Sequence, residues 1–264
     1  LEPKLIASHG HTIFHNPKAG YTLQIGDGQE IANATGIMTI NDFRTEDVKK
    51  GGQGAPLVPI GDRHLFADYP MCLNIGGIAN ISYEIDNKRI AYDICMANQL
   101  LNYLANKLGY DYDNNGNFAR QGNVNKELFD KLNDNMYYDD IPPKSLGREF
   151  FESKQRMIID NSTLDIKDII ATATEHIAYQ IVKATSNITT SKILITGGGA
   201  KNCHLINRIK DLSKHEIIIP DTMIIDYKEA LIFAFLGVLK MEGKINVLSS
   251  VTGADSDSSS GKTW

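Results

Sequence analysis

Two short apolar segments joined by a pair of adjacent glycines constrain the fold of this chain more than any other feature. Residues 71–75 and 78–82 are apolar and rich in isoleucine, which predicts two strands. Gly76 and Gly77 stand between them and predict a tight turn. Because glycine has no side chain, the backbone N–H groups of such a turn can approach an anion closely. An ordinary turn is the alternative, since short glycine motifs are common.

A second glycine-rich turn follows another predicted strand. Residues 192–196 lead into a run of three glycines, Gly197, Gly198 and Gly199. Residues 202–212 then predict a helix, whose N-terminus could face a phosphate or an adenosine. Two such turns, each leaving a strand, suggest two surfaces that close on one nucleotide. Each turn taken alone could equally be an ordinary connection.

The composition argues against several classes of protein. The 264 residues suffice for one large or two small domains, and 42% hydrophobic residues can supply a core. A net charge of −5 leaves no basic excess, which argues against a nucleic-acid partner. No apolar run approaches the roughly 20 residues that span a bilayer, so no membrane partner is expected. Three widely separated cysteines favour a reducing compartment, and hence the cytoplasm, over a disulfide framework.

Hydrophobic periodicity and turn residues predict the remaining elements. Strands are expected at residues 4–7, 21–25, 37–40, 88–92 and 216–219. Helices are expected at residues 29–35, 97–108, 126–132, 162–185 and 227–241. Ser145 is a candidate cap for a helix that follows it. The tail, residues 255–261, is rich in Ser and Asp and is expected to be mobile.

Asp93 is the candidate catalytic carboxylate. It stands between the predicted strand 88–92 and the predicted helix 97–108. A carboxylate at such a junction is well placed to act as a general base. It could equally be the N-cap of the helix, which is the commoner role for an isolated Asp.

The loop at residues 44–57 is the candidate substrate-binding segment. It is long, polar and glycine-rich, and it follows a predicted strand whose carboxyl end would collect ligands in an open α/β sheet. Within it, Arg44, Asp47 and Gln53 could together hold hydroxyls and a carboxylate. A solvated loop is the alternative.

Two patterns invite a metal interpretation, and neither is predicted to bind a metal. His9, His11 and His15 have no Cys or carboxylate cluster nearby, so they are better explained as polar residues at a strand end facing a cleft. Residues 111–116 resemble the opening of a calcium loop. The twelfth position of that loop is Gly122 rather than Glu, so the segment is predicted to be a turn.

Several long motifs, in order along nearly the whole chain, carry a family resemblance. They are residues 8–15, 21–26, 42–44, 51–59, 73–81, 143–149, 197–202, 228–231 and 250–254. With these motifs the chain resembles the anhydro-N-acetylmuramic acid kinase family, a branch of the actin, Hsp70 and hexokinase-like ATPase superfamily. The resemblance implies a two-domain α/β fold of the actin-like, ribonuclease H-like type, with a cleft between the domains. Residues 1–71, with 242–264 packing back on them, would belong to the sugar-binding domain, and residues 72–241 would form the nucleotide-binding domain.

The chain departs from the family pattern in two places. The family's catalytic stretch reads roughly FDTGPGN, and residues 92–98 keep only its Asp93 and Asn98. Family members also begin with a GTSxDG-like turn that binds phosphate and helps place Mg²⁺, and nothing in this sequence matches that turn. The chain opens with Leu1 rather than Met and enters a predicted strand almost at once, which suggests that N-terminal sequence is missing.

The resemblance implies a reaction and a set of site residues. The family opens the 1,6-anhydro ring of anhydro-N-acetylmuramic acid with water and phosphorylates O6 from ATP with Mg²⁺, in peptidoglycan recycling, and it suggests a homodimer. Asp93 would be the base that activates the water. The residues implied for the nucleotide are Gly76, Gly77, Asn80, Gly197, Gly198, Gly199, Asn202 and Glu229. Those implied for the sugar are His9, Arg44, Asp47, Gln53, Gly54 and Asn98, with Arg44 a natural partner for the lactyl carboxylate.

Two other hypotheses remain at this stage. The altered segment after Asp93 and the unmatched phosphate turn fit a non-catalytic sugar- or nucleotide-binding module of the same fold. A kinase that acts on a different amino sugar is the other.

Overall fold

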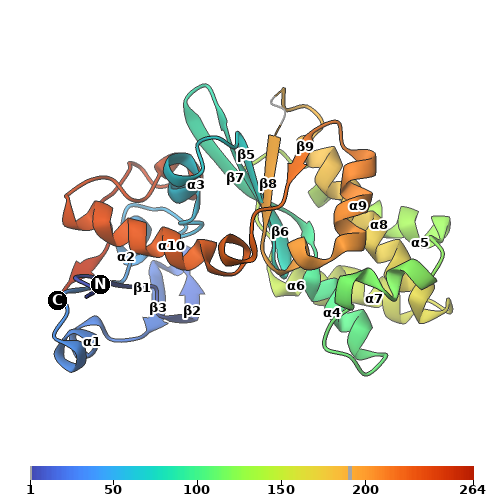
Figure 1. Ribbon diagram of the computed structural model, residues 1–264, viewed down its shortest axis with the longest axis horizontal. Coiled ribbons are helices and arrows are strands. Elements are labelled where there is room, and N and C mark those ends of the chain that lie inside the picture. Colours follow the sequence, from blue (N-terminus) through green and yellow to red (C-terminus); the bar gives the residue numbers. More distant parts are fainter. Residues whose placement is uncertain (1, 190–191) are drawn as a thin grey trace. The chain divides into compact units, whose positions relative to one another are not determined.

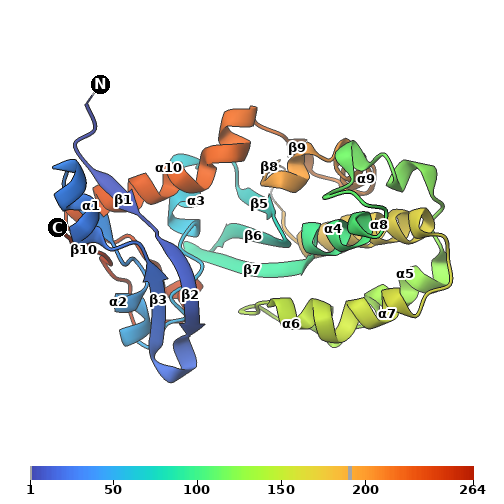
Figure 2. The same ribbon diagram turned by 90° about the horizontal axis from the view of Figure 1, so that it is seen from below.

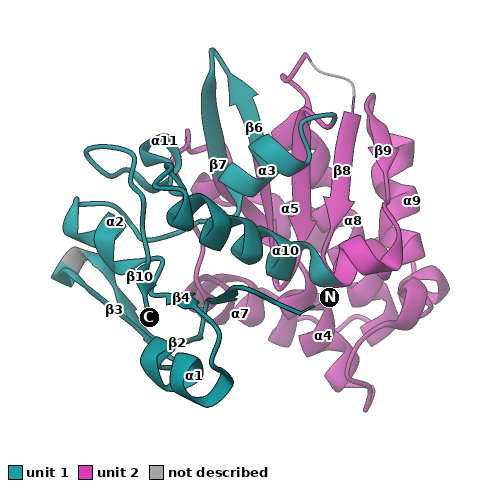
Figure 3. Ribbon diagram, turned by 60° about the vertical axis from the view of Figure 1, so that its left-hand side comes forward, with its two compact units in different colours: residues 1–68, 83–91, 227–264 teal, residues 69–82, 92–226 magenta. Residues whose placement is uncertain are grey.

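The structure, a computed structural model, describes residues 2–189 and 192–264 and divides into two compact units (Figure 3). Unit 1 comprises Leu1–Asp68, Tyr83–Ala91 and Tyr227–Trp264. Unit 2 comprises Tyr69–Ser82 and Tyr92–Asp226. The sequence-based division placed residues 227–241 with the nucleotide-binding domain, whereas here they group with unit 1.

Unit 1 holds two small sheets and several helices (Figures 1 and 2). The three-stranded sheet has the order β1-β4-β10, and a separate antiparallel pair is formed by β2 and β3. The strands are β1 (Ile6–Ser8), β2 (His11–Asn16), β3 (Tyr21–Ile25), β4 (Thr39–Asn41) and β10 (Lys262–Thr263). The helices are η1 (Pro17–Ala19), α1 (Gly28–Thr35), α2 (Thr45–Lys49), α3 (Pro59–Leu65), α11 (Ser249–Thr252) and most of α10 (Thr222–Met241).

Helix α10 groups with unit 1 because it packs closely on the segment around β1. A Cβ added to Gly237 would lie 2.8 Å from the Cβ of Ala7, so glycine lets the helix backbone approach the strand. One turn earlier, the ring of Phe233 lies with its centroid 4.5 Å from that of His9. These contacts are between residues far apart in the sequence, and a prediction based on local periodicity does not include them.

The C-terminal tail is packed into unit 1, so the expectation of a mobile tail is wrong. Asn246 is fully buried and its amide nitrogen donates to the carbonyl of Ser260 at 2.8 Å. In return the backbone N–H of Ser260 donates to Asn246 Oδ1 at 2.7 Å. The last residues then pair with β4 as strand β10. The polar composition of the tail serves internal hydrogen bonds rather than solvation.

Unit 2 is built on a five-stranded sheet with the order β7-β6-β5-β8-β9, in which β5, β8 and β9 are parallel. The strands are β5 (Met71–Ile75), β6 (Ile78–Ile85), β7 (Lys88–Met96), β8 (Lys192–Thr196) and β9 (Glu216–Ile218); the adjoining ends of β6 and β7 count with unit 1. The α-helices are α4 (Asn98–Asn106), α5 (Lys126–Asn133), α6 (Arg148–Phe150), α7 (Arg156–Asp160), α8 (Ile166–Thr185) and α9 (Cys203–Leu212). Short helical segments are η2 (Asn114–Gly116), η3 (Ala119–Gln121), η4 (Met136–Asp139), η5 (Phe151–Gln155) and η6 (Gly198–Lys201). The mixed α/β class predicted from the sequence is confirmed.

Some boundaries differ from the sequence-based expectations. Strand β7 continues to Met96, where the prediction ended at residue 92. Helix α8 starts at Ile166 rather than Ser162, because the side chain of Asp165 accepts the N–H of Lys167 and caps the helix there. Ser145 caps no helix, since α6 begins after Gly147 without a side-chain cap. Within the described ranges, no helix has both the length and the apolar content needed to cross a bilayer.

A buried polar network fixes α8 against its neighbours in unit 2. His176 is fully buried, and its Nδ1 donates to Asn133 Oδ1 at 2.8 Å. Its Nε2 lies 3.3 Å from the hydroxyl of Tyr138, which can donate to it. Burial lowers the pKa of His176 to about 3, so the imidazole stays neutral in the folded protein.

We predict that His176 makes the folded state less stable in mild acid. The pKa of His176 is lower in the folded than in the unfolded state, so its contribution is complete above about pH 6.5 and is lost as the pH falls towards 3. Between pH 7.5 and pH 5 this residue should remove about 2 kcal/mol from the free energy of unfolding. Urea unfolding of wild type and His176→Gln at both pH values measures the difference. The exposed His11→Gln is the control, and an equal acid loss in His176→Gln and wild type would contradict the prediction.

Candidate functional site

The parallel pairing of β5 and β8 brings the two glycine turns to the same end of the unit 2 sheet. In this register Asn74 pairs with Thr196. The first turn therefore begins two residues after the paired position, at Gly76, and the second begins one residue after it, at Gly197. Carboxyl ends of parallel strands are where ligands gather in open α/β sheets.

Two glycines of the second turn are required by packing. Gly197 has φ +83°, and a Cβ there would lie 2.5 Å from Asn74 Oδ1. A Cβ on Gly199 would lie 2.2 Å from Cγ2 of Ile75. Both contacts join the second turn to the end of β5. Gly198, between them, is exposed and its nearest neighbour would be Asn98 Nδ2 at 3.5 Å.

The glycines of the first turn are not required by packing. Neither Gly76 nor Gly77 has a positive φ. A Cβ on Gly77 would lie no closer than 3.8 Å to its neighbour, Gln99 Cβ, and one on Gly76 would lie 3.3 Å from Asn74 Nδ2. The carbonyls of the turn are held by the start of α4, since Asn98 N–H donates to Gly76 O at 3.0 Å. The turn is thus fixed while the space above it stays open.

The three asparagines assigned to the site have different positions in unit 2. Asn80 is half-buried in β6, shortly after the first turn. Asn98 donates its side-chain N–H to Ile75 O at 3.1 Å, which ties α4 to β5. Asn202 is 8% exposed, and its Oδ1 accepts the N–H of Leu205 as the N-cap of α9. Asn202 thus caps α9, and its contact with a nucleotide stays a prediction.

Asp93 lies inside β7, which removes the alternative that it caps a helix. The N-cap position of α4 is Ala97, and no side chain caps it. Burial raises the pKa of Asp93. The one opposing effect is a hydrogen bond from the backbone N–H of Leu146 to Asp93 Oδ2 at 2.9 Å, which lowers the pKa. A half-buried carboxylate with a raised pKa is suited to accept a proton.

The segment from η4 to α6 contacts Asp93, and the sequence analysis did not assign it to the site. Tyr137 donates its hydroxyl to Asp93 O at 2.6 Å. The N–H of Asp93 in turn donates to Lys144 O at 3.3 Å. Residues 143–149 were noted as a family motif, but their contacts with Asp93 are made largely by backbone atoms. Side-chain chemistry alone gives no signal for such contacts.

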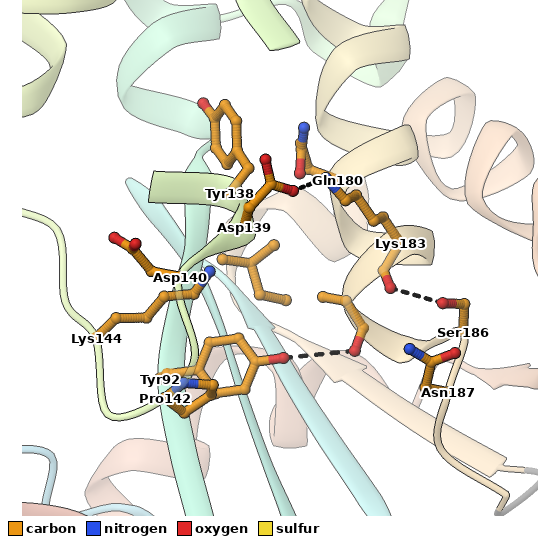
Figure 4. A pocket seen from close by; sticks show the side chains of 12 residues that line it. Tyr92, Tyr138, Asp139, Asp140, Pro142, Lys144, Gln180, Lys183, Ser186 and Asn187 are labelled. Carbon is orange, nitrogen blue, oxygen red and sulfur yellow. Dashed lines mark hydrogen bonds and ion pairs between the residues drawn. The ribbon is translucent and has the colours of Figure 1, made fainter. Parts of the chain in front are cut away.

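A cavity of about 430 Å³ is lined in part by this segment (Figure 4). Tyr92 and Ile94 line it, together with Lys144 and Lys183. Successive side chains of a strand point to opposite faces, so Asp93 does not line this cavity. The candidate catalytic carboxylate and the cavity are therefore separated by β7 itself.

In unit 1, Arg44 is held by two polar neighbours. Its NH1 donates to Gly54 O at 2.6 Å, and its NH2 lies 2.6 Å from His9 Nε2. Because a guanidinium can only donate, Nε2 of His9 accepts and its Nδ1 carries the proton that goes to Gly10 O at 3.0 Å. Burial, and then Arg44, lower the pKa of His9, which agrees with a neutral ring.

Glu229 lies near Arg44 and His9 within unit 1. It is exposed on α10 within unit 1. Its negative charge raises the pKa of both Arg44 and His9, in each case against the larger lowering by burial. The sequence analysis had assigned Glu229 to the ribose or adenine.

Asp47 is buried inside its segment and accepts two hydrogen bonds there, so it has a structural role, and its contact with the sugar stays a prediction. It is 0% exposed, and its Oδ2 accepts the N–H of Gly54 at 2.7 Å while Oδ1 accepts the hydroxyl of Thr252 at 2.7 Å. Gln53 is exposed, and its backbone N–H donates to Thr252 O at 2.8 Å. The segment is also not a plain loop, because it begins with α2. Asp47 therefore shapes the segment that holds Gly54 against Arg44.

Among residues 2–189 and 192–264 there is no group of three His, Cys, Asp or Glu side chains that could hold a metal ion. His9 and His15 have other partners, since His15 Nδ1 lies 3.0 Å from the hydroxyl of Thr22. Asp113 in the calcium-like segment accepts the backbone N–H groups of Phe118 and Ala119.

Comparisons with known proteins identify the family of this chain. The family model described as anhydro-N-acetylmuramic acid kinase matches residues 2–264. An anhydro-N-acetylmuramic acid kinase of Coxiella burnetii is 39% identical over 94% of this chain and 71% of its own length. One of Pasteurella multocida is 38% identical over 98% of this chain and 73% of its own length. A solved structure, the activator of the 2-hydroxyisocaproyl-CoA dehydratase from Clostridium difficile with bound ADPNP, is 17% identical, covers 80% of this chain and 82% of its own, and has a TM-score of 0.43.

The family model and the curated relatives place this protein in the class of ATP-dependent sugar kinases. The chain belongs to the anhydro-N-acetylmuramic acid kinase family, because the family model and the relatives both span nearly all of it.

We predict that Asp47→Ala lowers the stability of the folded protein, and not only its affinity for sugar. The change leaves the Gly54 N–H and the Thr252 hydroxyl without their acceptor, at a cost on the order of 3 kcal/mol for two hydrogen bonds to a charged group. Urea unfolding measures this loss. Thr252→Val should show a smaller loss of the same kind. Glu46→Ala, an exposed change on the same helix, is the control, and wild-type stability of Asp47→Ala would contradict the structural role.

Proposed function

We propose that this chain opens the 1,6-anhydro ring of anhydro-N-acetylmuramic acid with water and phosphorylates O6 from ATP. Membership of the kinase family supports the reaction as a whole. At the level of residues, the proposal is carried by one observation: Asp93 is a half-buried carboxylate, and burial raises its pKa. A base whose pKa is closer to the working pH transfers protons more efficiently than an ordinary carboxylate.

In the proposed mechanism, Asp93 takes a proton from a water molecule as the water oxygen bonds to C1 of the sugar. The bond between C1 and O6 breaks, and its electron pair remains on O6. O6 then attacks the γ-phosphate of ATP in line, and ADP leaves. Phosphoryl transfer of this kind depends mainly on positioning and on neutralising charge, so little further covalent chemistry is required of the protein.

For the nucleotide we propose that the open first turn offers its backbone N–H groups to phosphate. Gly77 suits this role because no packing contact explains the lack of a side chain there, and Gly76 stands next to it in the same turn. The exposed Gly198 offers a similar surface, and Asn80 an amide side chain. Gly197 and Gly199 are proposed to act by shape, since they let the second turn pack on β5, and Asn202 by capping α9.

For the sugar we propose that Arg44 pairs with the lactyl carboxylate. His9 and Gly54 hold the guanidinium in place, which lowers the entropy lost on binding. Glu229 is proposed for a sugar hydroxyl, because its charge acts on Arg44 and His9. Gln53, exposed beside Gly54, is proposed for another hydroxyl. Asn98 is proposed to support the first turn.

Mg²⁺, a homodimer and a cytoplasmic location are the finer parts of the proposal, and they come from the family resemblance. The described residues include no three-ligand cluster. Mg²⁺ is commonly bound through nucleotide phosphates and one or two carboxylates, so we propose that it arrives with ATP. Light scattering of the purified chain tests the dimer.

We predict that Asp93→Asn abolishes turnover while leaving ATP binding close to wild type. The amide keeps the shape of the side chain but cannot accept the proton from water. Incubation with ATP and the anhydro sugar, followed by detection of the 6-phosphate, measures turnover, and calorimetry measures ATP binding. Asp130→Asn, an exposed carboxylate paired with Lys126, is the control and should stay active. Near-wild-type turnover of Asp93→Asn would rule out this base.

The same assay separates the alternatives. Binding of ATP or sugar by the folded wild type without any product would favour a non-catalytic module. The feature that supports this alternative is residues 94–97, which replace most of the family's catalytic stretch and are buried. Product from a different amino sugar, and none from the anhydro sugar, would indicate a kinase with another acceptor.

We predict that Gly77→Ala and Gly199→Ala affect different properties: the first weakens ATP binding and the second lowers stability. A methyl on Gly77 has space, so the variant should fold normally and bind ATP at least several-fold more weakly. A methyl on Gly199 would collide with Ile75, so that variant should lose stability, by about 1–3 kcal/mol for overpacking. Thermal unfolding and the KM for ATP measure the two effects. Unchanged ATP affinity in Gly77→Ala would contradict the phosphate role of the first turn.

A further inference from the structure

The segment from Tyr137 to Leu146 holds Asp93 through three hydrogen bonds. Tyr137 Oη donates to Asp93 O at 2.6 Å, and Asp93 N–H donates to Lys144 O at 3.3 Å. The third bond runs from Leu146 N–H to the carboxylate, at 2.9 Å from Oδ2. Only this third bond acts on the reacting group. Since all three come from one segment, the first two fix where the third donor lies.

The side chain of Lys144 closes this segment on itself. Its Nζ donates to Tyr137 O at 2.8 Å. The ammonium also lies 4.6 Å from the centroid of the Tyr137 ring and 5.6 Å from that of Tyr92, distances at which a cation is attracted to the ring face. Figure 4 shows Lys144 and Tyr92 side by side at the wall of the cavity. Lys144 thereby joins the end that carries Tyr137 to the end that carries Leu146.

We propose that Tyr137 and Lys144 are positioning residues that keep the Leu146 N–H on the carboxylate of Asp93 and so tune the proton affinity of that carboxylate. The inference rests on the proposed role of Asp93 as the base. Neither side chain touches the carboxylate, and both act through the backbone of the segment.

The charges around Asp93 allow the direction of the effect to be worked out. Among the described residues, Tyr137 of η4 is an ionisable group that interacts with the charge of Asp93, whereas the Lys144 side chain lines the cavity with Tyr92 and Ile94. Burial and the charge of Asp93 raise the pKa of Tyr137 above its usual value, so the phenol remains a donor at neutral pH. Burial raises the pKa of Asp93 and the Leu146 N–H lowers it. Weakening that last bond must therefore raise the pKa of Asp93 further.

The test is the pKa of Asp93 in Tyr137→Phe and Lys144→Met. Tyr137→Phe removes the hydroxyl, and Lys144→Met keeps the length of the side chain without its charge or donor. In protein labelled with ¹³C-aspartate, the Asp93 carboxyl signal is assigned by its loss in Asp93→Asn. Each variant should raise the pKa of Asp93 by about 0.5 to 1 unit, the size expected for one weakened hydrogen bond. The acidic limb of kcat/KM against pH should move upward equally, with the KM for ATP unchanged.

Two further variants distinguish positioning from a general effect on the fold. Lys144→Arg keeps a cation that can donate to Tyr137 O and stack on the rings, so it should restore most of the wild-type pKa. Lys167→Met removes a lysine of α8 whose Nζ donates to Gln121 Oε1 at 2.7 Å, away from this segment, so it should leave the pKa of Asp93 unchanged. If Lys167→Met moves the pKa as far as Lys144→Met, or if neither Tyr137→Phe nor Lys144→Met moves it, the proposal is wrong.

The titration does not depend on turnover, so the two proposals can fail separately. A shifted pKa of Asp93 without product from the wild type would keep the positioning role and reject the kinase activity. Normal turnover with an unshifted pKa of Asp93 would keep the kinase activity and reject the positioning role. If Tyr137→Phe does not fold, Lys144→Met and Lys144→Arg decide the question by themselves.

Discussion

The structure of the candidate site depends on the parallel pairing of β5 with β8. This pairing sets Asn74 opposite Thr196, and both strands then end in glycines at the same edge of the sheet. The close approach of Gly199 to Ile75 is possible only without a Cβ, so the packing and the sequence agree at this point. The same strand end also receives α4, whose first residues bond to Ile75 and Gly76. Both turns and the helix after β7 are thus fixed by one strand end.

The contrast between two carboxylates shows how burial and hydrogen bonding divide structural from chemical roles. Asp47 and Asp93 both looked functional in the sequence. Asp47 is fully buried and accepts one donor on each oxygen, so it stabilises its segment. Asp93 is only half-buried, and a single backbone donor opposes the effect of burial on its pKa. A carboxylate of the second kind can take up and release a proton during a reaction.

Local signals in the sequence were sufficient for most elements. The helix expected at residues 29–35 is present as α1, which Asp27 caps and Gly36 ends with φ +67°. Asp86 and Asn87 both take positive φ, which is the conformation of the tight turn that joins β6 to β7. The errors lie where distant residues decide the outcome. Ser260 is ordered by Asn246, and α10 joins unit 1 through contacts with β1, and no local pattern contains either fact.

The site was predictable as a set of motifs but not as a set of roles, and the glycines show why. Gly77 and Gly199 look alike in the sequence, since each stands in a short glycine run after an apolar strand. Their surroundings differ, because a methyl on Gly199 would lie 2.2 Å from Ile75 and one on Gly77 would lie 3.8 Å from Gln99. One glycine therefore serves packing, while the other leaves a backbone surface open. The same limit applies to Leu146, whose contribution to Asp93 is a backbone N–H that every residue except proline carries. A sequence records side chains, whereas much of this site is made of backbone atoms whose positions depend on tertiary packing.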